Sequence, residues 1–227
     1  MAKQHIVILT GAGISAESGI NTFRGADGLW EGHDIMEVAS PEGYVKDPAL
    51  VLDFYNQRRA QLLTVKPNAG HTALVTLEEK YDVTLITQNV DNLHELAGST
   101  KIIHLHGELF KARSSIDPDA IVDWTEDIDL GTLAADGSQL RPHIVWFGED
   151  VPLIPTAVEY ASRADIFIII GTSLQVYPAA SLSQYVPLGT PIYLVDPNKP
   201  DGLASHITFM QGTATEKVPE LVEMLMG

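Results

Sequence analysis

Two histidines, His104 and His106, are separated by one residue and are followed directly by Gly107. In an extended segment this spacing places both imidazole rings on one face. A histidine near its ordinary pKa is the natural base at neutral pH. Paired histidines also bind metal ions, but no third ligand stands at a familiar spacing. A single histidine at a strand end is more often structural than catalytic, so the pair leaves both interpretations open.

A second polar group follows an apolar run and consists of Gln88, Asn89 and Asp91. The two amide side chains offer paired donors and acceptors, which suit a carboxamide ligand such as nicotinamide. The carboxylate of Asp91 is also suited to capping the next helix. The group therefore indicates a pocket for a neutral amide, with helix capping as the alternative for Asp91.

The turn that contains Gly11, Ala12, Gly13 and Ser15 matches the glycine fingerprint of dinucleotide-binding folds. Such a turn follows a strand and opens a helix, whose amide N–H groups meet a diphosphate. The acidic residue that usually follows about 20 positions later, at the end of a second strand, is missing. A dehydrogenase is therefore disfavoured, and a tight turn without a ligand is the alternative.

Two further residues suit a dinucleotide. Asp196 closes an apolar run and suits a ribose hydroxyl, although Asp-Pro-Asn is also strong turn chemistry. Arg24 lies in a glycine-rich stretch, residues 19–28, where its planar guanidinium would clamp a diphosphate. A surface arginine without a ligand is the alternative for Arg24.

The elements that must position these groups are strands and helices in alternation. Short β-branched runs predict buried parallel strands at Ile6–Leu9, Val83–Ile86, Ile166–Ile170 and Ile192–Val195. Helical patterns occur at Pro48–Leu63, His71–Lys80 and Thr156–Arg163. The alternation predicts an α/β fold with a doubly wound parallel sheet, in which ligands bind at the carboxyl ends of the strands. The polar groups should therefore meet at one edge of the sheet.

Two stretches break this alternation, and we interpret them as inserts that form a smaller lobe over the sheet edge. The single domain of 227 residues would then have a larger lobe of residues 1–20, 67–108 and 142–227. The smaller lobe would comprise residues 21–66 and 109–141. A cleft between the lobes is the natural place for an active site.

Composition excludes several classes of protein. Thirty acidic residues against 14 basic ones give a formal charge of −16, which repels nucleic acid and anionic lipid. The absence of cysteine excludes disulfides, thiolate zinc sites and cysteine nucleophiles. The apolar run at the N-terminus is too short for a signal peptide or a membrane span, so we expect a cytoplasmic protein.

Together these motifs resemble the sirtuin family of NAD-dependent protein deacylases. The matching segments are residues 11–20, 22–25, 87–94, 104–107, 141–149 and 171–173, in the order of the family. The resemblance implies a Rossmann-like lobe that binds NAD, and a smaller lobe with a helical module and a zinc-ribbon-like module. It also implies acyl-lysine proteins or peptides as substrates. We expect a monomer without nucleic-acid or membrane partners.

The resemblance carries roles onto individual residues of this chain. It assigns the diphosphate of NAD to Gly11, Ala12, Gly13, Ser15 and Arg24, with Phe23 shielding the reacting sugar carbon. It assigns the nicotinamide pocket to Gln88, Asn89 and Asp91. It assigns the adenosine half to Gly171, Thr172, Ser173, Asp196 and the backbone near Ala214.

The same resemblance implies how catalysis proceeds. The catalytic residues would be Asn89, Asp91 and His106, with His106 as the general base on a ribose hydroxyl that receives the acyl group. The substrate peptide would pair with the backbone as an added strand, contacting Val145, Phe147, Gly148 and Glu149.

Tyr55 and Arg58 resemble the Tyr-x-x-Arg pattern of class III sirtuins, which remove succinyl and malonyl groups. Residues three apart share a helix face, and a phenol with a guanidinium suits an acyl chain that ends in a carboxylate. Ala26 matches the small residue that widens this pocket. An ordinary amphipathic helix is the alternative, and deacetylation is expected beside desuccinylation.

The chain departs from the family in its ribbon module, where four cysteines normally bind one zinc ion. Ser114 stands where the first cysteine is expected, and the nearby carboxylates of Asp117, Asp119 and Asp123 are poor zinc ligands. We therefore predict no zinc. We expect burial of apolar side chains to hold the module, namely Ile121, Val122, Trp124, Ile128, Leu130, Leu133 and Leu140.

Two other functions fit the same motifs. One is a catalytically silent module that binds NAD or ADP-ribose, and the other is a protein ADP-ribosyltransferase. The presence of Asn89, Asp91 and His106 argues against a silent module, because binding alone needs no base at that place.

Overall fold

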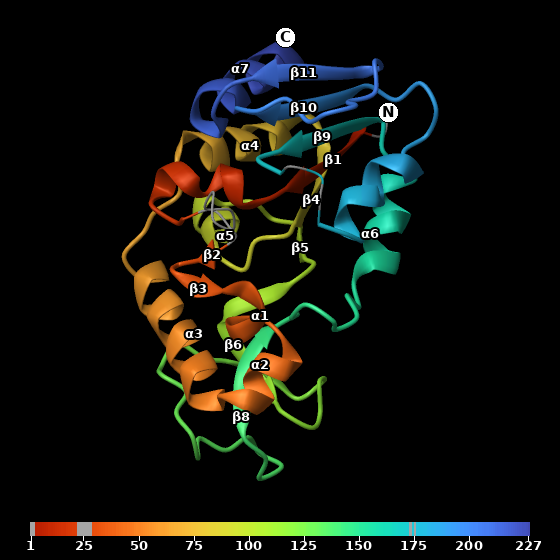
Figure 1. Cartoon of the computed structure of the whole chain (residues 1–227). Coiled ribbons are helices and arrows are strands. Elements are labelled where there is room, and N and C mark those ends of the chain that lie inside the picture. Colours follow the sequence, from red (N-terminus) through yellow and green to blue (C-terminus); the bar gives the residue numbers. More distant parts are fainter. Residues whose placement is uncertain (1–2, 22–28, 173, 175) are drawn as a thin grey trace.

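A six-stranded sheet forms the upper part of the protein, as seen in Figure 1, in a computed structural model that describes residues 3–21, 29–172, 174 and 176–227. All neighbouring strands are parallel, and the order is β11-β10-β9-β1-β4-β5. The strands are β1 (His5–Thr10), β4 (Asp82–Thr87), β5 (Ile102–His104), β9 (Ile166–Ile170), β10 (Ile192–Asp196) and β11 (Ile207–Gln211). The predicted doubly wound α/β sheet is confirmed.

The four predicted strands are the central ones, and the two edge strands β5 and β11 were missed. Central strands are covered on both faces, so they appear in the sequence as continuous apolar runs. Strand β11 contains half-buried and exposed residues but no fully buried one, and β5 is only three residues long. Neither edge strand therefore carries the apolar run on which the prediction relied.

Helices cover both faces of the sheet (Figure 1). One face is covered by α4 (Ala69–Lys80) and α7 (Ala214–Met226), which bury leucines such as Leu77 and Leu221 against β1, β4 and β9. The other face is covered by α6 (Ile154–Ala161) and the 3₁₀ segment η3 (Ala179–Tyr185). The short helix α5 (Leu93–Ala97) follows β4.

The glycine turn after β1 does not open the α-helix that its fingerprint predicts. Two 3₁₀ turns follow instead, η1 (Ala12–Ile14) and η2 (Ala16–Ser18). The carbonyl of Ile14, which an α-helix would offer to the amide of Ser18, accepts a hydrogen bond from the Asn68 side chain at 2.8 Å. The amide of Ser18 donates to the Ser15 carbonyl at 3.0 Å, which tightens the turn.

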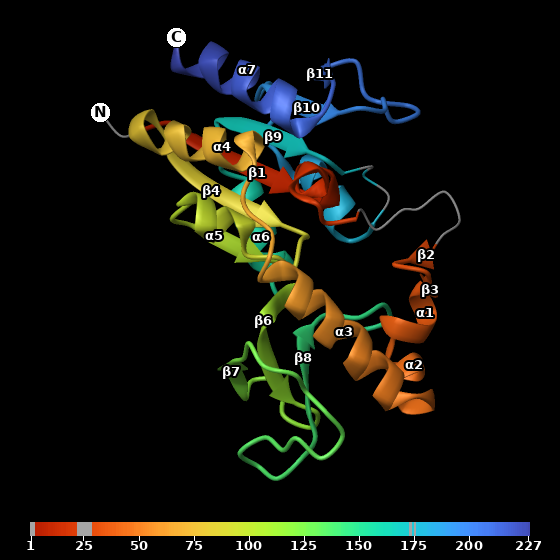
Figure 2. The ribbon, with the colours of Figure 1, turned by 90° about the vertical axis from the view of Figure 1, so that its left-hand side faces the viewer.

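A second, antiparallel sheet lies below the first, with three helices beside it (Figure 2). Its strands are β6 (Gly107–Ser114), β7 (Ile121–Asp123) and β8 (Leu140–Ile144). The helices are α1 (Ile35–Val38), α2 (Pro41–Lys46) and α3 (Pro48–Leu62), and a small hairpin joins β2 (Leu29–Trp30) to β3 (His33–Asp34). Aromatic side chains of α3 pack against Trp146 and Ile144, so this part has its own core. The lobe boundaries given above stay a prediction.

Only three of the seven apolar residues expected to hold the ribbon module pack into its core. Ile128 and Leu140 are buried, and Trp124 packs against them. The other four are between 42% and 61% exposed, namely Ile121, Val122, Leu130 and Leu133. The prediction is wrong for these four. Ile121 and Val122 are exposed because β7 pairs with β6 alone among the described strands, and Leu130 and Leu133 lie in the connection between β7 and β8.

A hydrogen-bond cluster closes the module at the predicted position of the first zinc ligand. The buried Ser114 hydroxyl donates to the Asp136 carboxylate at 2.6 Å and lies 2.8 Å from the Ser138 hydroxyl. The same oxygen accepts from the backbone amides of Ile116 and Asp117, at 3.1 and 3.0 Å. This Ser114 cluster connects the end of β6 to the turn before β8 without a metal ion.

Candidate active site

The carboxyl ends of β1 and β4 hold a buried polar network. The Ser15 hydroxyl donates to Asp91 Oδ2 at 2.9 Å and accepts from the Asn89 amide at 3.1 Å. Asp91 Oδ1 accepts from the Leu93 amide at 3.1 Å, so its carboxylate also supports the start of α5. Burial raises the pKa of Asp91. Asp91 thus takes the capping role that the sequence left open and also fixes Ser15.

Two histidines that the sequence analysis did not assign belong to this network. His71 Nε2 lies 3.4 Å from the Ser15 hydroxyl, and His94 Nε2 lies 3.1 Å from the Thr10 hydroxyl. Their rings are 4.9 Å apart and both are fully buried. Burial lowers the pKa of His71 to about 4 and that of His94 well below its ordinary value. Both stay neutral, and only tertiary contacts distinguish them from ordinary helix residues.

His106 lies between β5 and β6 with one ring nitrogen engaged. Its Nδ1 is 3.0 Å from the Gln88 carbonyl, and because a carbonyl only accepts, Nδ1 carries the proton. Nε2 then holds a lone pair, and the described residues provide it no partner. Burial lowers the pKa of His106, although the bond to Gln88 opposes this shift. A neutral imidazole with an open Nε2 is ready to accept a proton.

His104, the other histidine of the pair, serves a different purpose. Its Nδ1 lies 3.3 Å from the Asn89 carbonyl and its Nε2 lies 2.6 Å from a Glu95 carboxylate oxygen. Glu108 completes a group whose ligand-type atoms lie within 4.8 Å of one another. Its charges are already balanced, because Glu95 pairs with His104 and Glu108 pairs with Lys111. We therefore assign no metal to this group.

The site lies where the strand order of the sheet reverses. Strand β1 has β4 on one side and β9 on the other, so the strand order reverses there, and this is where open α/β sheets bind ligands. A Cβ at Gly13 would lie 2.6 Å from Gly171 Cα, so glycine is needed for the close approach of these two turns. The amides of Gly11 and Gly13 donate to the carbonyls of Ile170 and Gly171, so they are not the open donors that the fingerprint suggested.

Most residues assigned to the adenosine half lie along the same edge. The Thr172 hydroxyl accepts from the Gln88 amide at 3.2 Å, which joins the ends of β4 and β9. Asp196 ends β10 and accepts from the Asn198 amide at 2.8 Å, so the turn interpretation also holds. Ala214 is buried at the start of α7. Four predicted site residues lie outside the described residues, namely Phe23, Arg24, Ala26 and Ser173.

The segment assigned to the substrate peptide runs from β8 past His106. The Val145 amide donates to the His106 carbonyl and the Phe147 amide donates to the Ala39 carbonyl. Gly148 has a φ of 92°, and a Cβ there would meet nothing within 4 Å. No described residue bonds the Gly148 backbone, so this position is open to an added strand.

The Glu149 carboxylate points into the protein. It accepts from Arg141 Nη1 at 2.7 Å, from Arg113 at 3.2 Å and from the Trp146 amide at 2.8 Å. Burial alone would raise the pKa of Glu149, but the bonds from Arg141 and Trp146 outweigh it, so the pKa lies below its ordinary value. The Glu149 amide donates to the Trp146 carbonyl at 3.0 Å, so Glu149 can offer a peptide its carbonyl, while its side chain fixes the segment.

Replacing Glu149 by glutamine is expected to lower the free energy of unfolding at pH 7 by about 2 kcal/mol, the cost of losing charge-assisted hydrogen bonds. A lowered pKa stabilises the fold above the unfolded-state value and this stability is lost as the pH falls. The difference between wild type and variant should shrink from about pH 5.5 to pH 3. Urea unfolding across this range measures it, with exposed Glu159→Gln as the control. A constant difference would contradict the assignment.

The Tyr-x-x-Arg pair lies on α3, where the two residues have different surroundings. The Tyr55 side chain is fully buried, and its hydroxyl accepts from the Trp146 indole at 3.0 Å. Arg58 is half-buried, and its guanidinium carbon lies 4.9 Å from the Phe54 ring centroid. The neighbouring Arg59 is buried and donates to the Leu109 carbonyl and the Asn56 side chain.

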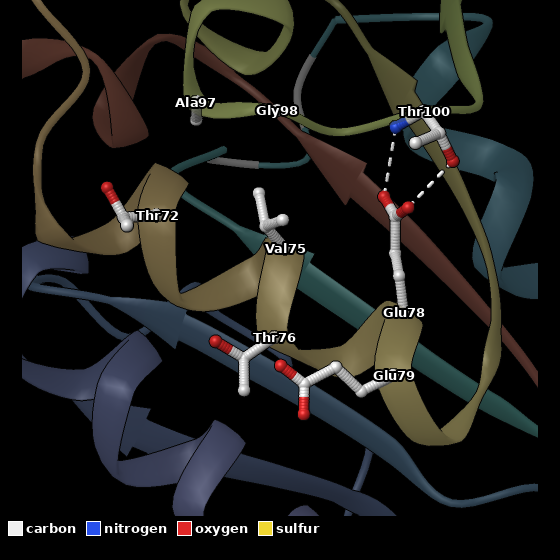
Figure 3. A pocket seen from close by; sticks show the side chains of 8 residues that line it. All are labelled: Thr72, Val75, Thr76, Glu78, Glu79, Ala97, Gly98 and Thr100. Atoms are coloured by element: carbon white, nitrogen blue, oxygen red, sulfur yellow. Dashed lines mark hydrogen bonds between the residues drawn. The ribbon is translucent and has the colours of Figure 1, made fainter.

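A surface hollow of about 460 Å³ lies elsewhere, against α4 and the loop before β5 (Figure 3). Glu78 bonds the amide and the hydroxyl of Thr100 across it, at 3.0 and 2.7 Å (Figure 3). None of the predicted site residues lines it; the lining residues are Thr72, Val75, Thr76, Glu78, Glu79, Ala97, Gly98 and Thr100. Among the described residues, no helix is both long and apolar enough to cross a membrane.

Comparisons with known proteins agree with this geometry. The model of the Sir2 family matches residues 11–178. A Helicobacter pylori NAD-dependent protein deacylase is 56% identical over 226 residues, covering 97% of this chain and 99% of its own. A protein of the same name from Bacteroides thetaiotaomicron is also 56% identical, covering 98% of both chains.

Solved structures extend the comparison to bound ligands. A Sir2 homologue in complex with NAD is 39% identical, with a TM-score of 0.88, covering 99% of this chain and 90% of its own. A Sir2 protein with a deacetylated p53 peptide and 3'-O-acetyl ADP-ribose is 32% identical, with a TM-score of 0.81, covering 98% and 93%. With this similarity along nearly its whole length, the chain belongs to the Sir2 family.

Proposed function

We propose that this NAD-dependent protein deacylase removes succinyl and malonyl groups from lysine side chains, removes acetyl groups as well, and releases nicotinamide and O-acyl-ADP-ribose. Acyl-lysine proteins of the cytoplasm are the proposed substrates, and the chain would act as a monomer. A formal charge of −16 disfavours nucleic acid and anionic membranes as partners.

The preference for acidic acyl groups is inferred from the surroundings of Arg58. The chain has 30 acidic and 14 basic residues, so carboxylates are abundant. Within the described residues, however, Arg58 makes no ion pair and no hydrogen bond, and its buried Nε has no acceptor. A half-buried guanidinium without a partner is costly, and a bound carboxylate would supply the missing acceptor.

The neighbouring Arg59 differs from Arg58 because two of its three nitrogens are bonded within the fold and only its Nη2 lacks a partner among the described residues. Its Nε donates to the Leu109 carbonyl at 3.1 Å and its Nη1 donates to Asn56 at 2.9 Å. Arg59 therefore joins α3 to β6 as part of the fold, while the adjacent Arg58 keeps its hydrogen-bonding capacity for a ligand.

The polar network at the sheet edge supports the chemistry of the proposal. Bound NAD would supply an electrophilic ribose carbon and a ribose hydroxyl that receives the acyl group. His106 Nε2 would remove the proton from that hydroxyl, since Nδ1 is committed to Gln88. Asn89 and Asp91 would hold the nicotinamide side of the site through their contacts with Ser15.

Two alternatives remain as outcomes of the experiment. A module that only binds NAD would not need a base beside the amide pocket. The imidazole of His106, whose Nε2 has no partner among the described residues, therefore favours catalysis. Protein ADP-ribosyl transfer uses the same site with another acceptor, and mass spectrometry distinguishes it because the mass of ADP-ribose would be added to the protein.

We expect Arg58→Met to lower kcat/KM for a succinyl-lysine peptide by about 10- to 100-fold, the loss of one or two charge-assisted hydrogen bonds. The same variant should change kcat/KM for an acetyl-lysine peptide by less than about threefold, because the acetyl group has no carboxylate. Mass spectrometry of both peptides incubated with NAD measures the two reactions.

Arg163→Met is the matched control, since Arg163 is exposed and pairs only with Glu159. It should leave both reactions unchanged. Failure of the wild-type protein to deacylate either peptide would reject the enzyme. Equal loss of both reactions in Arg58→Met would reject recognition of the acyl carboxylate.

A further inference from the structure

Two donors on one helix face lack acceptors in the part of the chain that the structure describes. One is the buried Nε of Arg58, and the other is the hydroxyl proton of Tyr55. The Tyr55 oxygen already accepts from Trp146 Nε1 at 3.0 Å, and an indole nitrogen only donates. The hydroxyl proton of Tyr55 must therefore point away from Trp146.

The indole of Trp146 has little freedom to turn away. Its backbone amide donates to Glu149 at 2.8 Å, and the Arg141 guanidinium lies 3.3 Å from its ring centroid. The ring of Tyr44 lies 5.1 Å away on a tilted plane. Arg141 is itself bonded to Glu149 and to the Ile144 carbonyl, so this arrangement fixes the direction of the indole N–H.

We propose that Trp146 is a positioning residue that selects for acidic acyl groups by committing Tyr55 to act as a donor. A phenol carries one proton and accepts as readily as it donates. Because Trp146 donates to the Tyr55 oxygen from one side, it directs the Tyr55 proton away from the indole, toward an acceptor such as the carboxylate of a succinyl or malonyl group. This inference rests on the proposed function and names a residue outside the Tyr-x-x-Arg pair.

Loss of the Tyr55 hydroxyl donor should weaken binding of a succinyl group more than binding of an acetyl group, and this difference produces the selectivity. A succinyl chain offers a charged acceptor, and a site built to hydrogen-bond a ligand discriminates strongly against one that lacks the group. An acetyl group ends in a methyl, so it gains nothing from the Tyr55 proton. Removal of the indole N–H should therefore act mainly on KM for acidic acyl chains.

The test is Trp146→Phe, which keeps an aromatic ring and removes the N–H. We expect kcat/KM for a succinyl-lysine peptide to fall about 10-fold, chiefly through KM, and that for an acetyl-lysine peptide to change by less than about threefold. Tyr55→Phe removes the hydroxyl proton of Tyr55 itself. If the two residues act as one unit, the double variant loses no more than Tyr55→Phe alone.

Replacing Trp146 by benzothienylalanine guards against misfolding, since this side chain matches indole in shape but has no N–H. It should reproduce the selective loss while the melting temperature stays within a few degrees of wild type. A parallel loss of both activities, or additive losses in the double variant, would overturn the role of Trp146. If the wild-type protein does not remove succinyl groups, both the role of Trp146 and the proposed acyl preference are overturned. If Trp146→Phe leaves the ratio of desuccinylation to deacetylation unchanged, only the role of Trp146 is overturned.

Discussion

Replacing His106 by alanine is expected to lower kcat for both acetyl- and succinyl-lysine peptides by about 10²- to 10⁴-fold, the usual contribution of a general base. The Gln88 carbonyl holds the proton on Nδ1, and burial lowers the pKa of the ring, so Nε2 is a neutral acceptor at pH 7. His71 and His94 cannot replace it because they are buried in contacts of their own, and His104 cannot because it is bound to Glu95.

His106→Ala should lower the rate of the chemical step without weakening the binding of NAD. NAD affinity, measured by calorimetry, should change by less than about threefold in His106→Ala, because the bonds among Ser15, Asn89 and Asp91 do not involve the ring. The exposed His206→Ala is the matched control and should keep full activity. A His106→Ala variant with more than about one tenth of wild-type kcat would show that another group accepts the proton.

Replacing Ser114 by alanine is expected to lower the free energy of unfolding by about 2 kcal/mol. The hydroxyl satisfies two backbone amides, of Ile116 and Asp117, and donates to Asp136. Alanine leaves these amides without this acceptor, and because Ile116 and Asp117 are exposed, water partly replaces the hydroxyl, so the loss stays near the lower end of the about 1–3 kcal/mol that each orphaned donor costs. Most other apolar residues of the module are exposed, so packing cannot compensate.

Urea unfolding measures this loss, and Ser115→Ala is the matched control because the Ser115 side chain is exposed and makes no bond among the described residues. A loss below about 1 kcal/mol in Ser114→Ala would contradict the role of the cluster. Addition of EDTA should leave the unfolding curve of the wild-type protein unchanged, because the chain has no cysteine to bind structural zinc. A lower midpoint with EDTA, restored by zinc, would contradict the absence of structural zinc.

Much of the fold could be predicted because buried parallel strands are apolar from end to end. The runs at β1, β4, β9 and β10 show in the sequence for this reason, and the polar groups that end them indicate the edge where a ligand binds. The edge strands β5 and β11 lack this pattern, since one side of each has no neighbour. The 3₁₀ turns after β1 depend on Asn68, which reaches Ile14 from 54 positions away.

Part of the candidate site could be predicted from the sequence, and part could not. The types and order of Gly11, Asn89, Asp91 and His106 indicate an NAD site and a base, because each motif is a short stretch whose chemistry is local. Local sequence cannot show which histidines are neutral and buried, since the pKa of His71 depends on desolvation by distant elements.

By itself the sequence determined the α/β sheet, the ligand-binding edge, the family and the absence of cysteine ligands. Only the tertiary structure decided how the cysteine-free module is closed and which side chains are bonded into the fold. The reason is physical: a hydrogen bond or an ion pair depends on which atoms meet across the fold. Ser114 meets Asp136, Arg59 meets Leu109, and Trp146 meets Tyr55, while Arg58 meets no acceptor among the described residues.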